Sequence, residues 1–428
     1  MSRVQNIENF QKSDLRKKAL EIIESAYDAI DTERAIERSV RVTKTMLYLG
    51  ETEFSLDSID KIIVIGAGKC SPPAACALEK ILGKLISGGI VIGTKKRELC
   101  SAAMIVREGT HPFPTEVNVS ATNEMLDLLH RLTNRDLVIA LISGGGSTLL
   151  CNPKNMTCGN EKDVVQKMFK NGATIEELNT IRKHISGARG GMLAYHAYPA
   201  RVVSFIFSDV PGNDISMVAS GPTVMDTTTV QDAEKIIEKY GLKSFFPSGS
   251  LIETVKDEKY FVRVSNEMLV SNDKALESMK LTSERLGFTT EIITNALRGE
   301  AKEIGKKVAE MIAVAPPHTA YLLGGEPTVT VTHEGYGGRE LEIVLSSVSH
   351  IKDDTIVVGF ASDGRDNCDF AGAVCDIMTA QNAKEKKVDP EQCLKENASY
   401  KFFETVGDFI MTGETGENVS DLIFAIKK

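Results

Sequence analysis

Short apolar runs that end in glycine recur along the chain and predict its strands. The clearest run, residues 137–142, holds six apolar residues without polar alternation, which is typical of a strand buried on both faces of a parallel sheet. Segments with apolar residues at helical spacing separate these runs, and this alternation predicts an α/β fold. The other runs lie in residues 61–69, 89–96, 102–106, 202–207, 288–294, 319–331 and 355–367.

Residues 12–49 predict two amphipathic helices, because Leu15, Ile22, Ile36 and Leu47 belong to apolar stripes at helical spacing. By contrast, the polar segment 159–172 predicts an extended loop and a short helix. Further helices are expected at 117–132, 175–194, 230–240, 272–287 and 299–313.

A chain of 428 residues is too long for one compact core, so we expect two domains. Residues 227–259 break the pattern of strands and helices, which places the boundary near 250 and predicts domains at 1–250 and 251–428. The last strand or helix can pack back onto the first domain.

The net charge of −9 argues against nucleic-acid binding. No apolar stretch approaches the length of a membrane span, and the charged amino terminus lacks a signal-peptide apolar region. We therefore expect a cytoplasmic protein with no membrane or nucleic-acid partner. The eight cysteines form no C-x-x-C pair and no zinc-ligand spacing, so we expect them to be reduced.

A glycine-rich turn, SGGGS, follows the run 137–142 directly. Glycine lets backbone N–H groups approach an anion closely, and open α/β sheets bind ligands at the carboxyl ends of their strands. We therefore interpret Ser143, Gly144, Gly145, Gly146 and Ser147 as a phosphate or carboxylate site. The alternative is a tight strand-to-helix turn without a ligand.

A second glycine turn, GAGK at 66–69, differs from both familiar phosphate motifs. Cys70 replaces the Ser or Thr of a Walker A loop, and Ser71 occupies the place of the third glycine of a dinucleotide fingerprint. Lys95 and Lys96 end the next run, where an acidic ribose-binding residue would be expected. A nicotinamide cofactor is therefore disfavoured. The lysine of the turn is either ligand-facing or a solvated turn residue.

Charged residues end several apolar runs. Lys69, Asp209, Glu326 and Asp363 stand at such ends, and Arg339 opens a predicted helix. Cations can hold phosphates and aspartates can hold magnesium, which favours phosphoryl transfer to a small anionic acceptor. Capping of turns by Asp side chains is the alternative interpretation.

Eight motifs together resemble the glycerate 2-kinase family, and the carboxyl-terminal part resembles its MOFRL domain. Members of this family are often labelled hydroxypyruvate reductases. The resemblance covers nearly the whole chain in order. The motifs are GAGK at 66–69, SGGGS at 143–147, NTIRKHIS at 179–186, SDVPGNDISMVASGPT at 208–223, GGEPTVTV at 324–331, GGRELE at 337–342, SDGRD at 362–366 and TGETGENVSDL at 412–422.

This resemblance implies phosphorylation of D-glycerate at its 2-hydroxyl by ATP and Mg²⁺, giving 2-phosphoglycerate. It also implies a Rossmann-like amino-terminal α/β/α sandwich, a smaller α/β domain and an active-site cleft between them. Family catalysis depends on a lysine and an arginine that match Lys69 and Arg339. We expect small-molecule partners only, and a monomer or homodimer.

Each motif supplies candidate site residues. We expect Lys69, Arg339 and Asp209 to be catalytic, and Asp209 and Asp363 to hold Mg²⁺. The expected substrate- and phosphate-binding residues are Ser143, Gly144, Gly145, Gly146, Ser147, Lys183, Gly221, Gly325, Glu326 and Asp363.

Two other functions remain as alternatives. The first is an NAD(P)-dependent hydroxypyruvate reductase, which the incomplete dinucleotide fingerprint disfavours. The second is a non-catalytic protein that binds a nucleotide or a sugar acid, although such a binder has little need of carboxylates beside an anion site.

Overall fold

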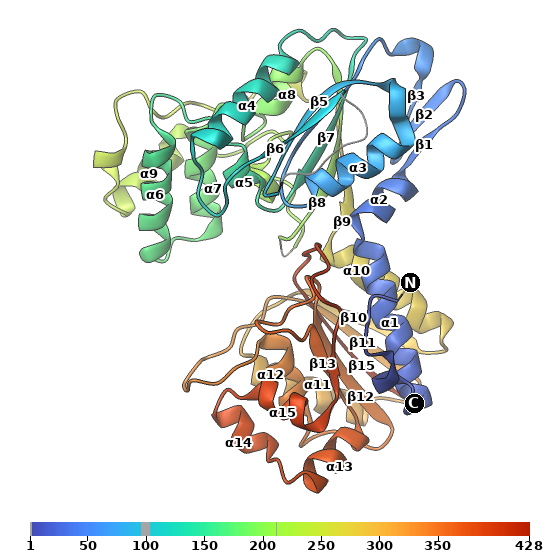
Figure 1. Cartoon of the computed structure of the whole chain (residues 1–428). Coiled ribbons are helices and arrows are strands. Elements are labelled where there is room, and N and C mark those ends of the chain that lie inside the picture. Colours follow the sequence, from blue (N-terminus) through green and yellow to red (C-terminus); the bar gives the residue numbers. More distant parts are fainter. Residues whose placement is uncertain (1, 96–102, 211) are drawn as a thin grey trace. The chain divides into compact units, whose positions relative to one another are not determined.

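A computed structural model describes residues 2–95, 103–210 and 212–428, so Lys96 lies outside the described residues. The chain forms two compact α/β units, each with its own sheet (Figure 1). The central unit comprises 32–210 and 214–269. The terminal unit comprises 2–31 and 270–428, with a short piece that includes Asn213.

The sheet of the central unit has the strand order β6-β5-β4-β7-β8-β9. Strands β4 to β8 pair in parallel, as the unbroken apolar runs predict, and their carboxyl ends therefore share one edge. The strands are β4 (Ile62–Ala67), β5 (Ile86–Gly93), β6 (Met104–Glu108), β7 (Leu137–Ser143), β8 (Arg201–Phe207) and β9 (Val264–Val270).

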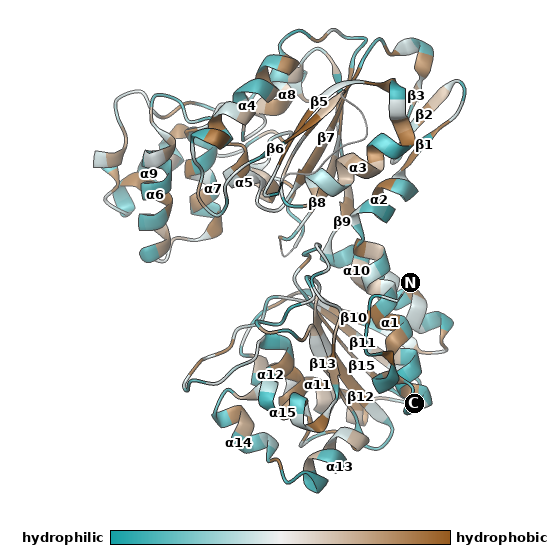
Figure 2. Ribbon diagram, in the orientation of Figure 1, coloured by the Kyte–Doolittle hydropathy of each residue, from teal (hydrophilic) through white to brown (hydrophobic). Residues whose placement is uncertain are grey.

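Helices cover both faces of this sheet. Helix α3 (Ser71–Leu82) contacts β4, β5 and β7, while α4 (Glu116–Leu129) and α8 (Met192–Ala197) share an apolar core with the sheet. Figure 2 shows the strands as the most hydrophobic elements of the unit. The short helix α5 (Gly146–Leu149) follows β7 directly.

A second layer of helices carries its own small core. It contains α6 (Cys158–Lys170), α7 (Ile175–His184) and α9 (Val230–Lys239), which lie together in Figure 1. The prediction of a loop with a short helix at 159–172 is therefore wrong. Few apolar residues suffice here, because Val164 and Met168 need to fill only a small core between three helices.

The prediction of two helices over residues 12–49 is also wrong in its second half. Helix α2 (Thr32–Ser39) ends before residue 40, and a small antiparallel sheet follows. There, burial alternates every second residue, and the hydroxyl of Thr43 accepts a hydrogen bond from the Met46 backbone in the turn. The strands are β1 (Val40–Val42), β2 (Met46–Leu49) and β3 (Thr52–Ser55).

The sheet of the terminal unit is mixed, with the order β10-β11-β15-β12-β13-β14. Strands β10 and β11 are parallel, whereas β15 runs antiparallel to both of its neighbours, β11 and β12. The last strand thus lies inside this sheet. The strands are β10 (Thr289–Leu297), β11 (Thr319–Gly325), β12 (Thr355–Ala361), β13 (Gly372–Cys375), β14 (Phe409–Ile410) and β15 (Asp421–Lys427).

Helices again cover both faces. Helices α1 and α10 pack together on one face, and α11, α12 and α15 contribute to the core on the other (Figure 1). The helices are α1 (Asp14–Ile30), α10 (Asn272–Arg285), α11 (Ala301–Val314), α12 (Arg339–Ser347), α13 (Ile377–Glu385), α14 (Pro390–Lys395) and α15 (Ser399–Val406). Short 3₁₀ helices span Ile7–Phe10, Leu56–Ser58, Gly83–Leu85, Val218–Ser220, Lys243–Phe245 and Glu258–Tyr260.

A buried arginine joins the first helix to the terminal unit. Arg16 is fully buried and forms ion pairs of 2.7 Å with both Asp376 and Asp408. The unit bounds thus differ from the expected ranges 1–250 and 251–428, because the first 31 residues pack with the carboxyl-terminal elements.

Within the described residues, no helix is both long enough and apolar enough to cross a membrane. The cysteines that the structure describes are all free thiols.

Candidate functional site

Two glycine turns meet at the carboxyl edge of the parallel sheet. The backbone N–H of Lys69, after β4, donates to the carbonyl of Gly144, after β7, at 2.9 Å. The next N–H, that of Cys70, donates to Ser143 Oγ at 3.0 Å. These hydrogen bonds fix Lys69 beside the glycine loop, which we define as residues 143–147.

Two glycines make this close approach possible. A Cβ atom on Gly68, whose φ is +139°, would overlap the side chain of Ser143. A Cβ atom on Gly144 would overlap the carboxylate of Asp209, which follows β8. The ends of β4, β7 and β8 therefore bring Lys69, the glycine loop and Asp209 together, as the sequence predicts.

Positive charge surrounds the loop. Lys69 is exposed, and its side chain lies against Gly145 beside the ring of His111. Burial, Lys69 and Arg182 lower the pKa of His111. Burial, together with Arg189, also lowers the pKa of Arg182, to about 10. Arg189 itself is paired with Glu161 at 2.8 Å, so Lys69 and Arg182 are the cations that act on His111 beside the loop.

The site prediction omitted His111 and Arg182. Arg182 Nε is buried and makes no hydrogen bond within the described part of the chain. Arg182 could have been predicted from its position beside Lys183 in the NTIRKHIS motif, which carries several basic residues on one helix.

Ser147 connects the loop to a strained segment. Its hydroxyl lies 3.0 Å from that of Ser220, which donates to Asn179 Oδ1 of α7 at 2.5 Å. Ala219 and Ser220 both have positive φ angles, 52° and 60°, which side chains other than glycine rarely adopt. Gly221 continues this conformation, and a Cβ atom on it would crowd the Ser216 backbone, so it serves the geometry of the turn itself.

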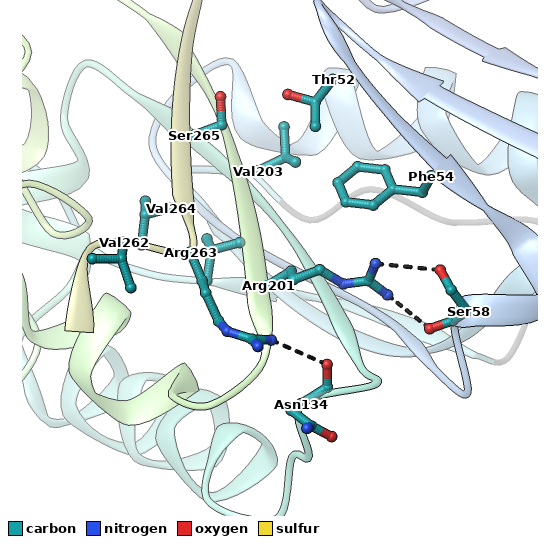
Figure 3. Close-up of a pocket in the computed structure, with 11 residues that line it drawn as sticks. Thr52, Phe54, Ser58, Asn134, Arg201, Val203, Val262, Arg263, Val264 and Ser265 are labelled. Atoms are coloured by element: carbon teal, nitrogen blue, oxygen red, sulfur yellow. Dashed lines mark hydrogen bonds between the residues drawn. The ribbon is translucent and has the colours of Figure 1, made fainter. Parts of the chain in front are cut away.

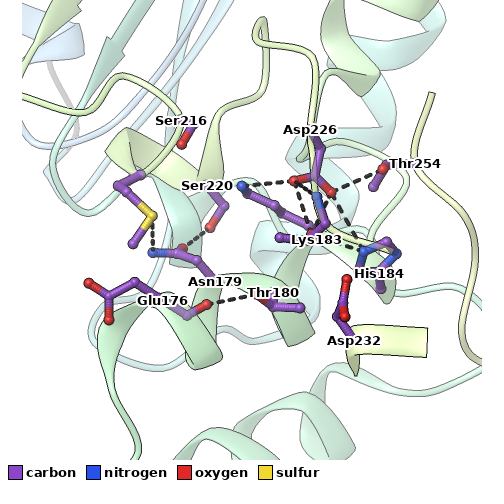
Figure 4. A network of polar contacts seen from close by, with 12 residues as sticks. Glu176, Asn179, Thr180, Lys183, His184, Ser216, Ser220, Asp226, Asp232 and Thr254 are labelled. Carbon is purple, nitrogen blue, oxygen red and sulfur yellow. Dashed lines mark hydrogen bonds and ion pairs between the residues drawn. The ribbon is translucent and has the colours of Figure 1, made fainter. Parts of the chain in front are cut away.

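Lys183 is bound within the protein. Its ammonium lies 3.1 Å from the carboxylate of Asp226, and both side chains are buried (Figure 4). Although burial favours the neutral acid, Lys183 and Thr228 hold the pKa of Asp226 below its ordinary value. His184 donates to or accepts from Thr228 and lies 3.6 Å from Asp226. These contacts tie α7 to the segment after the strained turn.

The terminal unit holds a separate pocket of about 530 Å³. It lies where β11 and β12 end and where β15 and α12 begin. Because β15 runs antiparallel, its first residue, Asp421, pairs with Gly325 on one side and with Ala361 on the other. The pocket gathers the predicted residues Glu326, Arg339 and Asp363.

Arg339 is held by an ion pair. Its Nε atom lies 2.8 Å from the carboxylate of Asp421. Burial opposes the charge of Arg339, but Asp421 and Glu326 raise its pKa above the ordinary value. Burial and neighbouring carboxylates, chiefly that of Asp366, raise the pKa of Asp421 to about 8, although Arg339 opposes this.

Two buried carboxyl groups lie beneath this pair. Asp366 accepts a hydrogen bond of 2.7 Å from the Leu341 N–H at the start of α12, and burial raises its pKa to about 6. Glu340 is fully buried, and neither carboxyl oxygen has a hydrogen-bond partner among the described residues. Burial and Asp421 raise the pKa of Glu340 well above its ordinary value.

The two remaining predicted carboxylates are exposed to solvent. Glu326 Oε1 accepts a hydrogen bond of 3.3 Å from Ser420, and Asp363 Oδ1 accepts one of 3.0 Å from the Arg365 N–H. Across the described residues, no group of three or more His, Cys, Asp or Glu side chains is arranged to hold a metal ion.

Comparison with known proteins identifies the family of this chain. Residues 18–251 match a domain of unknown function, DUF4147, and residues 319–421 match the MOFRL family. A glycerate 2-kinase of Pyrococcus horikoshii is 35% identical over 96% of this chain and 97% of its own length. This chain belongs to the glycerate 2-kinase family. A D-glycerate 2-kinase of Thermotoga maritima is 33% identical over 97% of this chain and 99% of its own length.

The fold agrees as well. The crystal structure of a glycerate kinase from Thermotoga maritima matches 97% of this chain and 99% of its own, with a TM-score of 0.86 and 32% identity. The family and the two-part α/β fold predicted from the motifs are thus confirmed.

Proposed function

We propose that this protein is a glycerate 2-kinase, which transfers the γ-phosphoryl group of ATP to the 2-hydroxyl of D-glycerate. The products are 2-phosphoglycerate and ADP. The proposal rests on one observation in a chain that aligns with glycerate 2-kinases over nearly its whole length. Lys69 lies against the glycine loop at the edge where the carboxyl ends of the parallel strands meet. Phosphoryl transfer needs such fixed donors where charge shifts between oxygens.

In the central unit, we assign Lys69 and the glycine loop to an anionic group of a substrate. Lys69 supplies a full positive charge, and the side chains of His111 and Ser147 can donate hydrogen bonds. Ser143 and the small size of Gly144 and Gly145 shape the loop. Asp209, seated against Gly144, is our candidate to orient the attacking hydroxyl.

In the terminal unit, we assign the guanidinium of Arg339 to a second anionic group. Asp421 engages Nε of Arg339, which leaves the two terminal nitrogens of the guanidinium in position to donate in parallel to a carboxylate or phosphoryl group. The pocket of about 530 Å³ is large enough to receive such a group. Glu326 forms another part of its wall, and Gly325 directly precedes it as the last residue of β11.

Magnesium is part of the proposal. A bound Mg²⁺ neutralises phosphate charge, and it commonly takes only one or two protein carboxylates together with phosphate oxygens and water. Asp209 and Asp363 are carboxylates of this kind at two strand ends, so each fits as a single ligand. We also expect a cytoplasmic enzyme, because ATP and a reducing environment for the free thiols are found there.

A coupled assay tests the function. Purified protein is given D-glycerate, ATP and Mg²⁺, with enolase present and phosphoglycerate mutase absent. Because enolase accepts 2-phosphoglycerate, we expect immediate signal. Signal only after mutase is added would identify 3-phosphoglycerate and contradict the choice of hydroxyl. No ATP consumption, with NADH oxidation on hydroxypyruvate instead, would favour the reductase.

A further inference from the structure

A pocket of about 650 Å³ opens at the other end of the parallel sheet in the central unit (Figure 3). Arg201, which lines it, is the first residue of β8, whereas Asp209 lies just beyond the last residue of the same strand. This pocket is therefore separate from the glycine loop and from everything assigned to the kinase reaction above.

Two arginines face the pocket and bind only neutral oxygens. Arg201 donates to the hydroxyl and the carbonyl of Ser58, at 3.3 and 2.9 Å. Arg263 donates to the carbonyls of Asn134 and Pro199, at 3.3 and 3.5 Å. Figure 3 shows the Arg201 guanidinium beside Ser58 and the Arg263 guanidinium beside Asn134, on two sides of the pocket that both residues line. Neither has a carboxylate within 4.0 Å among the described residues.

The charge of this pair is poorly compensated. Burial, Arg263 and Arg135 lower the pKa of Arg201. Arg135 is itself paired with Asp60 at 2.8 Å, whereas Arg201 Nε is buried and lacks a hydrogen-bond partner within the described ranges. Two adjacent arginines with neutral partners form a site that an anion would stabilise, because their forked donors match the geometry of carboxylates and phosphates.

The rest of the pocket combines apolar side chains with polar ones such as Thr52 and Ser265. The guanidinium of Arg201 lies 5.0 Å from the centre of the Phe54 ring, and Val203 and Val264 form part of the wall. Val262, at the rim, is 75% exposed, which is unusual for a large apolar side chain. A bare phosphate would fill only part of this volume, so the walls fit a ligand with an organic body.

We propose that this pocket is a second anion site, which binds a small organic phosphate. The phosphoryl group lies between Arg201 and Arg263, and the organic body packs on Phe54 and Val262. The site is distinct from the proposed kinase site, so it is open to test whether or not the kinase proposal holds.

Arginine modification provides a local test. The full-length protein is treated with phenylglyoxal, and the rate at which Arg263 is modified is followed by peptide mass spectrometry. The exposed Arg131, elsewhere in the same unit, is the internal control. The probes are phenyl phosphate, inorganic phosphate and phenol, each against potassium chloride of equal ionic strength. We expect phenyl phosphate to slow modification of Arg263 several-fold, at lower concentration than inorganic phosphate, and phenol to have no effect.

A matched pair of variants keeps folding separate from binding. Val262→Asp places a negative charge at the rim, and Val314→Asp places one at another highly exposed valine, in α11 of the terminal unit. Protection of Arg263 by phenyl phosphate should disappear in Val262→Asp and persist in Val314→Asp. Three results would overturn the proposal. Phenyl phosphate could protect Arg131 and Arg263 equally, it could still protect Arg263 in Val262→Asp, or it could give no protection at all. If inorganic phosphate protected Arg263 as well as phenyl phosphate does, the proposal that the ligand has an organic body would be contradicted.

Discussion

Lys69 is attached to the glycine loop through its backbone, while its side chain extends over the loop. Replacement by alanine therefore keeps the structural hydrogen bond and removes only the charge. We expect Lys69→Ala to lower kcat/KM by about 10²- to 10³-fold, the usual cost of losing one donor to a transition state. The enolase-coupled assay measures this, with thermal unfolding as the check on folding.

Lys61 is the matched control for this experiment. It is exposed just before the same strand, β4, at the end remote from the loop. Lys61→Ala should retain the activity of the unaltered enzyme. If Lys69→Ala retained it too, the side chain would have no part in catalysis.

Asp366 gives the stability of the protein a pH dependence of known sign. Its pKa rises from the ordinary 3.8 to about 6 in the folded protein. The folded state therefore binds a proton more tightly than the unfolded state, and this stabilising contribution is lost as pH rises from about 4 to about 6. Across that window, the free energy of unfolding should fall in the unaltered protein relative to Asp366→Asn, which cannot titrate. Urea unfolding at several pH values measures the difference.

Asp369→Asn is the control for this pH series, because Asp369 is exposed a few residues away. Its unfolding should keep the pH dependence of the unaltered protein. A constant difference between the unaltered protein and Asp366→Asn at every pH would mean that Asp366 does not titrate in this range.

At the residue scale, the sequence predicted the charged site residues that follow a strand, but not those that precede one. Lys69, Asp209, Glu326 and Asp363 follow apolar runs, where parallel strands bring side chains to one edge. Asp421 precedes its strand and reaches the pocket only because β15 is antiparallel, which no local pattern reveals. The burial of Lys183 against Asp226 also depends on distant segments meeting.

At the scale of the strand-and-turn elements, Gly144 couples the end of β7 to the end of β8. Its φ is compatible with alanine, but a Cβ atom there would overlap the Asp209 carboxylate. We expect Gly144→Ala to displace Asp209 and lower kcat at least as much as it raises KM, while the strands stay folded. Steady-state kinetics and far-UV circular dichroism measure both effects.

Gly159→Ala is the comparison for this substitution. Gly159 lies in the first turn of α6, where the nearest atom to a new Cβ would be Thr157 Oγ1 at 3.5 Å. Activity should be unchanged, because the added methyl group meets no crowded atom. Unchanged kinetics in Gly144→Ala as well would show that the position of Asp209 does not matter.

Strands with continuous apolar runs were predictable, because burial on both faces leaves a clear pattern. The parallel sheet of the central unit is confirmed in this way. Helix α6 and strands β1 to β3 were not predictable, since each buries only a few residues against a small local neighbour. Short elements of this kind depend on packing rather than on periodicity.

For the whole molecule, Arg16 joins segments that are 360 and 392 residues apart in sequence. We expect Arg16→Ala to destabilise the protein by about 3–5 kcal/mol, because buried Asp376 would lose its cation and buried Asp408 would keep only the exposed Lys12. Equilibrium unfolding in urea measures the loss.

Arg285→Ala removes a pair of the same kind from the surface. Arg285 of α10 lies 2.9 Å from Glu21 of α1, and both side chains are exposed. An exposed pair contributes about 0–1 kcal/mol, so this variant should lose little stability. A similar small loss in Arg16→Ala would mean that the first helix contributes little to the terminal unit.

The existence of two α/β units was predictable from length and from the break in pattern near 250. The sequence did not predict that residues 2–31 belong to the terminal unit. An amphipathic pattern indicates that a helix packs against something, but it does not indicate which element it packs against. Here the partner is α10, together with the carboxylates that surround Arg16.

The position of β15 has a consequence for synthesis on the ribosome. The central unit is continuous enough to fold while the chain is still being made. The terminal unit, in contrast, lacks a strand between β11 and β12 until residues 421–427 have left the exit tunnel. Until then β11 and β12 cannot be joined, because β15 is the strand that pairs with both of them. The incomplete sheet of the terminal unit is therefore exposed to nascent-chain chaperones for longer than the sheet of the central unit.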